Sequence, residues 1–356
     1  MNPALLDHLR RRITSPTDDA ERAEAARSAL DRWSTRAKPP GSLGRLEDVA
    51  VRIAGITGTC PPAVPGKPAV VVFAGDHGVV ADGASAWPSE ITAAMVRTMA
   101  AGGAAINAFA AQAGASVTLV DVGVSSDLSD LHALGRPDVL DRRVGAGTDS
   151  IAHGPAMTRD DALAALAVGA AVADEAMDAG ADLLVGGDMG IGNTTPSVAL
   201  IACLTGREPE PLVGPGAGLP ADGLVHKQSL VRAAVDRARD LADPVDVLAE
   251  VGGLEIAALA GLHLAAAARR VPAIVDGVIG GAALCVADAI APGAAAHVVG
   301  GHRSTEPAAT AALEHLGLEP LLALDLRLGE GTGACLAIPL VQAACRALRD
   351  LADLPS

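Results

Sequence analysis

Aromatic side chains are almost absent from this sequence, since its 356 residues include two Trp, two Phe and no Tyr. Basic residues are also outnumbered, because 27 Lys and Arg stand against 42 Asp and Glu and leave a formal net charge of −15. Proteins that bind nucleic acid usually combine basic surfaces with aromatic rings that stack on bases. The composition therefore argues against a nucleic-acid partner and favours a small-molecule ligand.

Cysteines are few, and their spacing excludes two common roles. The five cysteines are Cys60, Cys203, Cys285, Cys335 and Cys345. No C-x-x-C pair occurs among them, and an odd number cannot be fully paired, so we expect reduced thiols and neither a zinc framework nor a disulfide framework. The basic residues near the start of the chain are not followed by the apolar run of a secretory signal, so we expect a cytoplasmic protein.

Long apolar runs and several common catalytic motifs are missing as well. Apolar runs such as residues 277–287 are interrupted before the roughly 18 residues that a membrane helix needs. No H-E-x-x-H, G-x-S-x-G or G-x-x-x-x-G-K-[ST] motif occurs, so zinc hydrolysis, serine hydrolysis and a standard triphosphate-binding loop have no support. No G-x-G-x-x-G follows an early strand, which removes support for a dinucleotide-dependent dehydrogenase.

The sequence does contain a series of short apolar runs that are rich in β-branched residues and are followed by glycine-rich loops. These runs cover residues 69–74, 117–122, 183–185, 273–275 and 297–299. Helical patterns cover residues 223–241, 254–270 and 333–351, and about the first thirty residues are predicted to be a charged helix. This organisation predicts an α/β fold with a parallel sheet. The chain is long enough for one large domain or two smaller ones, and the segment Lys38-Pro39-Pro40-Gly41 is a plausible boundary.

Polar residues stand in the loops where a parallel sheet binds its ligands. The loop GGDMGIGNTT at residues 186–195 joins bare glycine backbone to hydroxyl groups at a helix start, so its N–H groups could face an anion such as phosphate. Asp76, His77, Lys227 and Glu330 stand in or after other glycine-rich loops. The structural alternative is that these residues only form turns, caps or solvated surface. The residues by themselves thus predict an enzyme or binding protein for a small anionic ligand.

Nine short motifs follow one another along nearly the whole chain. They are KPPGSLGRLE (38–47), AGDHGV (74–79), GGAAIN (102–107), PAMT (155–158), GDMGIGNTT (187–195), GGLEIAALAG (252–261), DGVIGGAAL (276–284), GHRSTEP (301–307) and LRLGEGTGA (326–334). In this order the motifs resemble those of the nicotinate-nucleotide:dimethylbenzimidazole phosphoribosyltransferase family. Each motif is weak alone, but their shared order makes the resemblance specific.

The resemblance implies a reaction and an architecture. The reaction is transfer of the phosphoribosyl group of nicotinate mononucleotide to 5,6-dimethylbenzimidazole, giving α-ribazole 5'-phosphate and nicotinate for the nucleotide loop of cobalamin, without a metal or other cofactor. The implied fold is a three-layer α/β/α domain with a parallel Rossmann-like sheet (38–332) and a small helical domain formed by both chain termini (1–37 and 333–356), in a homodimer. The alternatives are the same reaction on another acceptor base, or a noncatalytic protein that binds a nucleotide or a cobamide precursor.

The resemblance also implies roles for individual residues. Glu330 in GEGTG matches the general base, and Asp188 stands where some members carry Glu as a second catalytic carboxylate. Ala94, after the Trp87 segment that faces the acceptor base, stands where other members often carry Gln. Together with the loop positions above, the expected substrate-binding residues are Gly190, Gly192, Lys227, Ser304, Gly329, Gly331, Asp76, His77 and Trp87.

Overall fold

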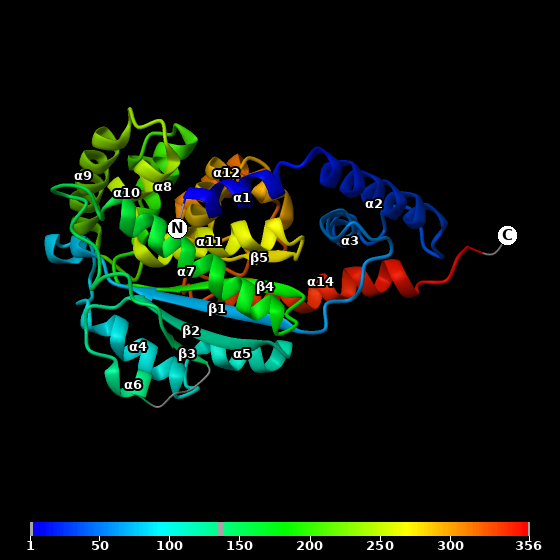
Figure 1. Ribbon diagram of the computed structural model, residues 1–356, viewed down its shortest axis with the longest axis horizontal. Helices are drawn as coiled ribbons and strands as arrows, with labels where there is room; N and C mark the ends of the chain where they lie inside the picture. The colour runs from blue at the N-terminus through cyan, green and yellow to red at the C-terminus, as the bar shows by residue number, and fades with distance from the viewer. Residues whose placement is uncertain (1–2, 134–137, 355–356) are drawn as a thin grey trace.

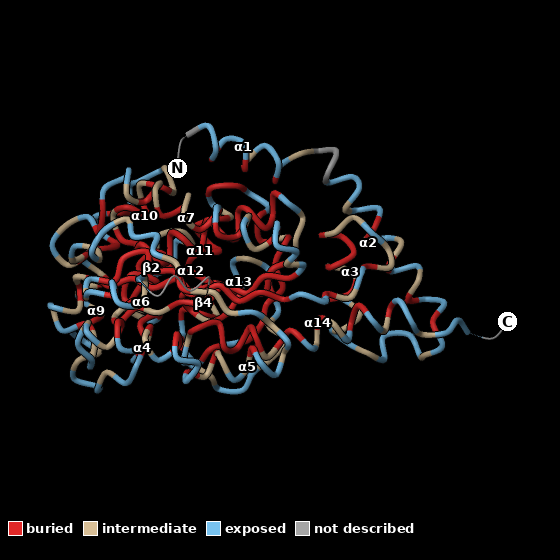
Figure 2. Tube along the Cα trace, turned by 60° about the horizontal axis from the view of Figure 1, so that its bottom comes forward, coloured by how far each residue is buried: buried red, intermediate tan, exposed pale blue. Residues whose placement is uncertain are grey.

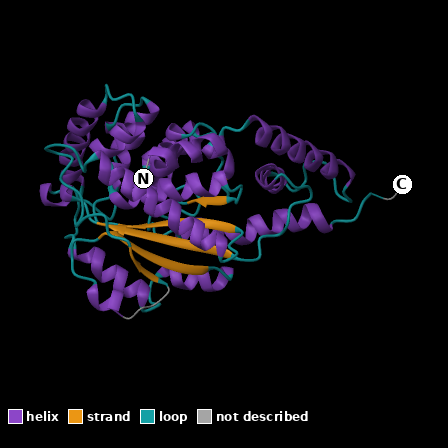
Figure 3. Cartoon of the chain, in the orientation of Figure 1, coloured by secondary structure: helices purple, strands orange, loops and turns teal. Residues whose placement is uncertain are grey.

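Six parallel strands form a single sheet in the order β3-β2-β1-β4-β5-β6. The computed structural model describes residues 3–133 and 138–354. The strands are β1 Pro68–Gly75, β2 Ser116–Gly123, β3 Val139–Asp141, β4 Leu183–Met189, β5 Ala273–Val275 and β6 Val298–Gly300. Helices cover both faces of the sheet (Figures 1 and 3). This arrangement confirms the predicted α/β fold with a parallel sheet.

The helices connect the strands and extend beyond the sheet at one end. They are α1 Pro3–Ile13, α2 Pro16–Thr35, α3 Arg45–Thr57, α4 Glu90–Ala100, α5 Ala105–Ala113, α6 Ser129–Ala133, α7 Arg159–Asp178, α8 Thr194–Thr205, α9 Ala221–Ala238, α10 Pro244–Val251, α11 Leu254–Ala268, α12 Val278–Ile290, α13 Pro307–His315 and α14 Thr332–Asp350, with short 3₁₀ turns at Gly78–Asp82, Glu210–Leu212 and Ala294–His297. Over the described ranges, none of these helices has both the length and the apolar character to cross a membrane.

The central strand β1 shows why the apolar runs form the middle of the molecule. Successive side chains of a strand point to opposite faces, and every residue of β1 is buried. Val71 and Phe73 pack into the core under α7, α11 and α12, whereas Val70 and Val72 pack against α3, α5 and α14. The buried chain trace in Figure 2 is accordingly concentrated in the sheet and in α11, so the core is aliphatic on both faces, as the composition requires.

Two strands differ from the sequence-based expectation. β4 continues to Met189, four residues past the expected end, because Gly186 and Gly187 still pair with β1. A Cβ at Gly187 would overlap the carbonyl oxygen of Glu330, so this glycine permits close packing inside a strand and does not begin the loop. The strand β3 was not expected, since its three residues carry too short an apolar pattern to be recognised.

The helices near the two chain termini pack against different parts of the molecule. The first thirty or so residues form two helices, and Leu6, Leu9 and Ile13 of α1 join the core of the α/β body. The helices α2 and α3 and the end of α14 lie together beyond the sheet (Figure 1). Arg32 of α2 fixes this group, because its Nε donates to Leu348 O at 2.8 Å.

Candidate active site

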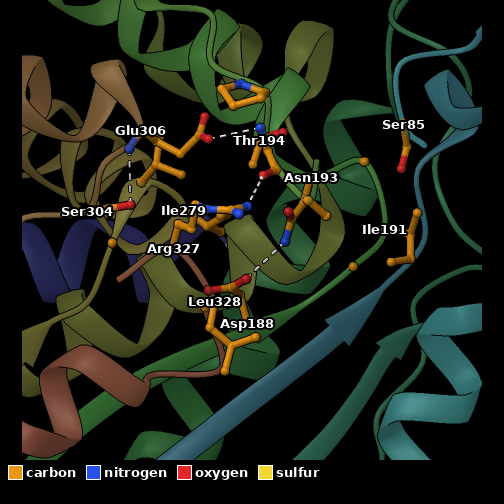
Figure 4. A pocket seen from close by; sticks show the side chains of 18 of the residues that line it. Ser85, Asp188, Ile191, Asn193, Thr194, Ile279, Ser304, Glu306, Arg327 and Leu328 are labelled. Atoms are coloured by element: carbon orange, nitrogen blue, oxygen red, sulfur yellow. Dashed lines mark hydrogen bonds between the residues drawn. The ribbon is translucent and has the colours of Figure 1, made fainter. Parts of the chain in front are cut away.

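A cavity lies beside the carboxyl ends of β4, β5 and β6, where a parallel sheet binds its ligands. In Figure 4, Ser304 and Glu306 lie on one side of this space, Ser85 and Ile191 on the other, and Asp188 and Leu328 below. The polar side chains in the lining are Ser85, Asp188, Asn193, Thr194, Lys227, His302, Ser304, Glu306 and Arg327. Loops from distant parts of the sequence therefore converge on one site.

One end of the cavity is built to receive an anion. Lys227 of α9 is only 1% exposed, and its Nζ donates to Thr194 Oγ1 at 2.8 Å and to Gly214 O at 3.0 Å. Thr194 is the first residue of α8, so the positive end of the helix dipole lies beside the ammonium group. Burial lowers the pKa of Lys227 to about 8, although the nearby Glu306 carboxylate raises it.

Glu306 and Arg327 hold the glycine turn beside this anion-binding end. Glu306 Oε1 accepts from Gly216 N at 2.9 Å, and Arg327 Nη1 donates to Gly216 O at 3.2 Å. Gly216 has a φ of +55°, a left-handed conformation that favours glycine. The turn is thus fixed from both sides, which places its backbone next to Lys227.

The opposite end of the cavity is acidic. Asp188 stands near the end of β4, is 6% exposed, and its Oδ2 accepts from Asn193 Nδ2 at 3.0 Å. Burial raises the pKa of Asp188 well above its ordinary value, and the charge of Asp276 raises it further. A carboxyl group whose pKa is raised is a better proton acceptor when it ionises, which suits acid–base chemistry.

Glu330 lies close to Asp188 but outside the cavity lining. Its backbone N donates to Asp188 O at 3.2 Å, while its Oε2 accepts from Ile106 N at 3.3 Å, in the first turn of α5. Burial raises the pKa of Glu330, and the hydrogen bond from Ile106 lowers it. The backbones of the two expected catalytic residues are therefore hydrogen-bonded to each other, but only Asp188 lines the cavity.

The other expected site residues fall into two groups. Gly190, Gly192, Lys227, Ser304 and Gly329 line the cavity together with Asp188. Asp76, His77 and Gly331 are not in the lining, and Trp87 is 51% exposed at its edge, where Nε1 donates to Ala217 O at 3.0 Å. The structure thus brings the first group together in the cavity lining and leaves the second group behind or beside the cavity.

Asp76 and His77 support the site from behind. His77 Nε2 lies 2.7 Å from Glu255 Oε1 in a hydrogen bond between two fully buried side chains. Asp76 Oδ2 accepts from the backbone N and the hydroxyl of Ser125. A Cβ at Gly190 would come 3.2 Å from His77 Nε2, so the buried pair packs directly under the turn that lines the cavity.

Several lining residues were not predicted from the sequence: Ser85, Asn193, His302, Glu306 and Arg327. His302 and Glu306 belong to the GHRSTEP motif, from which only Ser304 was chosen. Asp276, which affects the pKa of Asp188, directly follows the run at 273–275. A signal that could have found these residues is their position after a strand, where every polar side chain is a candidate.

One group among the described residues has the spacing of a metal site, at the exposed edge of the sheet near β3. It comprises Asp121, His132 and Asp141. His132 Nε2 faces Asp121 Oδ2 at 3.6 Å, whereas Nδ1 faces Asp141 Oδ2 at 3.2 Å. Arg143 already approaches both carboxylates, with its Nε 3.6 Å from Asp121 Oδ2 and 3.3 Å from Asp141 Oδ1, and its positive charge opposes a cation at the same place. The geometry favours an imidazole that bridges two acids over a metal centre.

A parallel α/β fold with a buried lysine at a helix N-terminus and a carboxyl group of raised pKa in the same cavity defines an enzyme for a small anionic substrate. The model of a family described as "Phosphoribosyltransferase" matches residues 19–356, almost the whole chain. The chain belongs to this phosphoribosyltransferase family.

Known relatives match over nearly their full length. Proteins named nicotinate-nucleotide–dimethylbenzimidazole phosphoribosyltransferase are similar to it: the one from Salinispora tropica is 50% identical and covers 94% of each chain, and the one from Desulforudis audaxviator is 46% identical and covers 98% of this chain and 96% of its own. The crystal structure of CobT from Thermus thermophilus is 46% identical, has a TM-score of 0.89, and covers 93% of this chain and 97% of its own.

Proposed function

We propose that this protein transfers the phosphoribosyl group of nicotinate mononucleotide to 5,6-dimethylbenzimidazole, giving α-ribazole 5'-phosphate and nicotinate for cobalamin assembly. The observation that carries the proposal is that Lys227 and Asp188 line opposite ends of the same cavity. A phosphate-binding end and an acid–base end are the two features that this substrate and this reaction require. The names of relatives that are about half identical to the chain support the same reaction.

The nucleotide is placed with its phosphate at the anion-binding end. Lys227 supplies the cation and the N-terminus of α8 supplies the positive end of a helix dipole. Ser304 lies farther along the same wall and contacts the sugar or the phosphate. Gly190 and Gly192 line the cavity on this path, and a Cβ at Gly190 would overlap Gly75 O, so the turn packs tightly against the end of β1.

The acceptor base occupies the side of the cavity that is lined by Ser85, Ile191 and Leu328, with Trp87 at its edge. These walls are mainly aliphatic, in keeping with the composition of the whole chain. A planar, largely apolar benzimidazole fits such a surface better than a hydrated or charged molecule does.

The chemistry needs one proton acceptor. Nicotinate is bonded to the ribose through a positively charged pyridinium nitrogen and leaves as a stable ring without help from an acid. One ring nitrogen of the benzimidazole attacks C1' from the opposite face, the bond to nicotinate breaks, and a carboxylate takes the proton from the other ring nitrogen. Glu330 is the proposed base, and it reaches the acceptor when its carboxylate leaves Ile106 N. Asp188 is its proposed partner at the floor of the cavity.

The direct test is an assay with purified protein, nicotinate mononucleotide and dimethylbenzimidazole, with released nicotinate measured by chromatography. The proposal predicts release that depends on the acceptor base. Release with other bases but not with dimethylbenzimidazole would place the reaction on a different acceptor. No release with any benzimidazole or purine would contradict catalysis and support a binding protein.

We further propose a cytoplasmic homodimer. Leu324 and Leu328 are 55% and 58% exposed in the segment that precedes α14, and Trp87 beside the cavity is 51% exposed; exposed large apolar side chains of this kind are found at interaction surfaces. All five cysteines are free thiols, which suits a reducing compartment. Sedimentation of the wild-type protein and of Leu324→Glu tests the assembly, because the charged variant is expected to shift the protein toward monomer.

A further inference from the structure

His302 and Asp276 form a buried pair that the proposed reaction has not used. Asp276 follows β5 and His302 follows β6, and these neighbouring parallel strands bring both residues to the same edge of the sheet. His302 is 3% exposed, and its Nδ1 lies 3.1 Å from Asp276 Oδ1. Asp276 Oδ1 is in turn fixed by Ala334 N, which donates to it at 2.8 Å from the first turn of α14.

The imidazole ring is confined so that one particular edge faces the cavity. A Cβ at Gly333 would overlap the ring on its Nδ1 side, so α14 closes that side completely. On the other side, a Cβ at Gly277 would come 3.5 Å from Cε1 and 3.8 Å from Nε2. Gly277, His302 and Ser304 all line the cavity. Nε2 is therefore the ring nitrogen left to meet a ligand.

We propose that His302 recognises the ribose of the nucleotide by accepting a hydrogen bond from its 2'- or 3'-hydroxyl through Nε2, and that Asp276 is the residue that positions the ring. This inference rests on the proposed function, because it takes the phosphate to lie at Lys227 and C1' near Asp188. Asp276 is close enough to Asp188 to affect its pKa, and Ser304 lies toward Glu306. His302 therefore stands between the two ends of the nucleotide, where the sugar must lie.

The chemistry of the pair favours a hydroxyl over the phosphate. A carboxylate beside Nδ1 favours a proton on that nitrogen and leaves the lone pair on Nε2. A lone pair accepts a hydrogen from a hydroxyl group, but it repels the oxygens of a phosphate. The phosphate also has its own donors at Lys227 and α8, to which His302 adds nothing.

Two substitutions of His302 test the roles of its two ring nitrogens separately. In His302→Asn, the side-chain amide nitrogen takes the place of Nδ1 and keeps the contact with Asp276, but nothing reaches the cavity. In His302→Gln, the amide group reaches the position of Nε2 and can still accept a hydroxyl hydrogen. Each variant is assayed with nicotinate mononucleotide, its 2'-deoxy and 3'-deoxy analogues, and nicotinate riboside, which lacks the phosphate.

The expected result is a penalty that depends on one hydroxyl. His302→Asn should lower kcat/KM for nicotinate mononucleotide and for the riboside by about 3- to 10-fold, the net worth of a neutral hydrogen bond. The penalty should disappear with the deoxy analogue that lacks the contacted hydroxyl. His302→Gln should recover part of the loss.

Three results would overturn the proposal. A penalty that vanishes with the riboside would assign His302 to the phosphate, and an equal penalty with every substrate would make the ring merely structural. Wild-type enzyme that shows no hydroxyl-dependent difference between the substrates would contradict it without any variant, even if His302→Asn fails to fold. If the wild type releases no nicotinate from the mononucleotide at all, the proposed function itself has failed.

Discussion

A backbone hydrogen bond links Glu330 to Asp188, yet their carboxyl groups lie in different surroundings. Glu330 has a φ of +63°, an uncommon conformation for a residue other than glycine. Such a conformation persists only when the surrounding structure requires it, and it is frequent at functional sites. Here it turns the side chain toward α5 while the flanking Gly329 and Gly331 pack against Asp188 and β4.

Replacing Glu330 tests its role as the base. Glu330→Gln keeps the size and most hydrogen bonding of the side chain but cannot take a proton. A general base typically contributes about 10²- to 10⁴-fold, so kcat should fall within that range while binding of nicotinate mononucleotide changes little. The measurement is steady-state kinetics combined with calorimetric binding.

Asp188→Asn is the matched comparison, because it removes the other carboxylate and keeps a partner for Asn193. If Asp188 mainly orients the loop, this variant should lose less activity than Glu330→Gln. A near-normal kcat for Glu330→Gln together with an inactive Asp188→Asn would reverse the two roles. That outcome would make Asp188 the base, which its position in the cavity lining allows.

Lys227 gives the reaction a pH dependence on the alkaline side. Because burial lowers its pKa to about 8, the ammonium group is present below that pH and is lost as the pH rises through it. The value of kcat/KM for nicotinate mononucleotide reports the free enzyme, so it should decline above about pH 8. Stopped assays from pH 6.5 to 10 with limiting nucleotide measure this decline.

Lys227→Arg serves as the control, since a guanidinium group stays protonated over this whole range. The variant should have lower activity because the arginine is larger, but its alkaline decline should be absent. A wild-type profile that stays flat up to pH 10 would contradict the lowered pKa of Lys227, and an unchanged decline in Lys227→Arg would assign the decline to another group.

The aliphatic walls of the acceptor side predict a broad choice of base. One methyl group in an apolar pocket changes discrimination by only about 1–3 kcal/mol, and Ile191 and Leu328 offer no polar group that could reject an unsubstituted ring. Benzimidazole should therefore compete with dimethylbenzimidazole within about a thousandfold in kcat/KM. A stronger preference in a mixture of the two bases would contradict this expectation and would point to a specific contact, for which Ser85 is the polar side chain on this side of the cavity.

At the scale of single residues, the sequence predicted those site residues that stand beside glycines. Asp188 and Lys227 stand in or after glycine-rich loops, but the roles of these two residues and of Ser304 were predicted from the family resemblance of the motifs that contain or flank them. His302 and Asp276 could not be recognised as a pair, because 26 positions of sequence separate them and only the pairing of β5 with β6 brings them together. Nor could the sequence show that the Glu330 carboxylate turns toward α5.

At the scale of elements, the connection from β4 to α8 has the least freedom. Its turn passes between Gly75 at the end of β1 and the cavity, and the buried His77–Glu255 pair lies behind it. The added methyl group of Gly190→Ala would overlap Gly75 O, so the backbone must shift. A displacement of about 1 Å at reacting groups can cost roughly 10²-fold, so we expect a loss of kcat/KM of that order.

Gly154→Ala is the control for this substitution. Gly154 has open space around its Cα and no positive φ, so the variant should keep normal activity and stability. If Gly190→Ala had the same kinetics as Gly154→Ala, the turn would tolerate a Cβ, and close packing against Gly75 would not explain the glycine.

Elements were predicted well where their patterns were long and apolar. The helix expected at 254–270 is α11, which is buried along its whole length, and the strand expected at 69–74 is β1. Prediction failed where tertiary contacts set the boundary. β4 continues through two glycines because β1 and Glu330 lie against it. The break between α1 and α2 has a local cause that was overlooked, since Pro16 disfavours the helical conformation at Ser15.

At the scale of the whole molecule, we propose that the small helical unit consists of α2, α3 and the end of α14. The expected division placed α1 with this unit and α3 outside it. Trp33 of α2 and Ile53 of α3 share a core with Leu348 of α14, whereas α1 lies across the α/β body. The chain thus begins on the α/β body, next forms α2 and α3 of the small helical unit, and returns to the small helical unit at the end of α14.

The central claim is that this fold carries out phosphoribosyl transfer with inversion at C1'. The most direct measurement is identification of the products formed from nicotinate mononucleotide and 5,6-dimethylbenzimidazole, by chromatography and by NMR of the anomeric proton. We expect nicotinate and the α-anomer of ribazole 5'-phosphate in equal amounts. A β-anomer, release of nicotinate without a new nucleotide, or no release at all would contradict the claim.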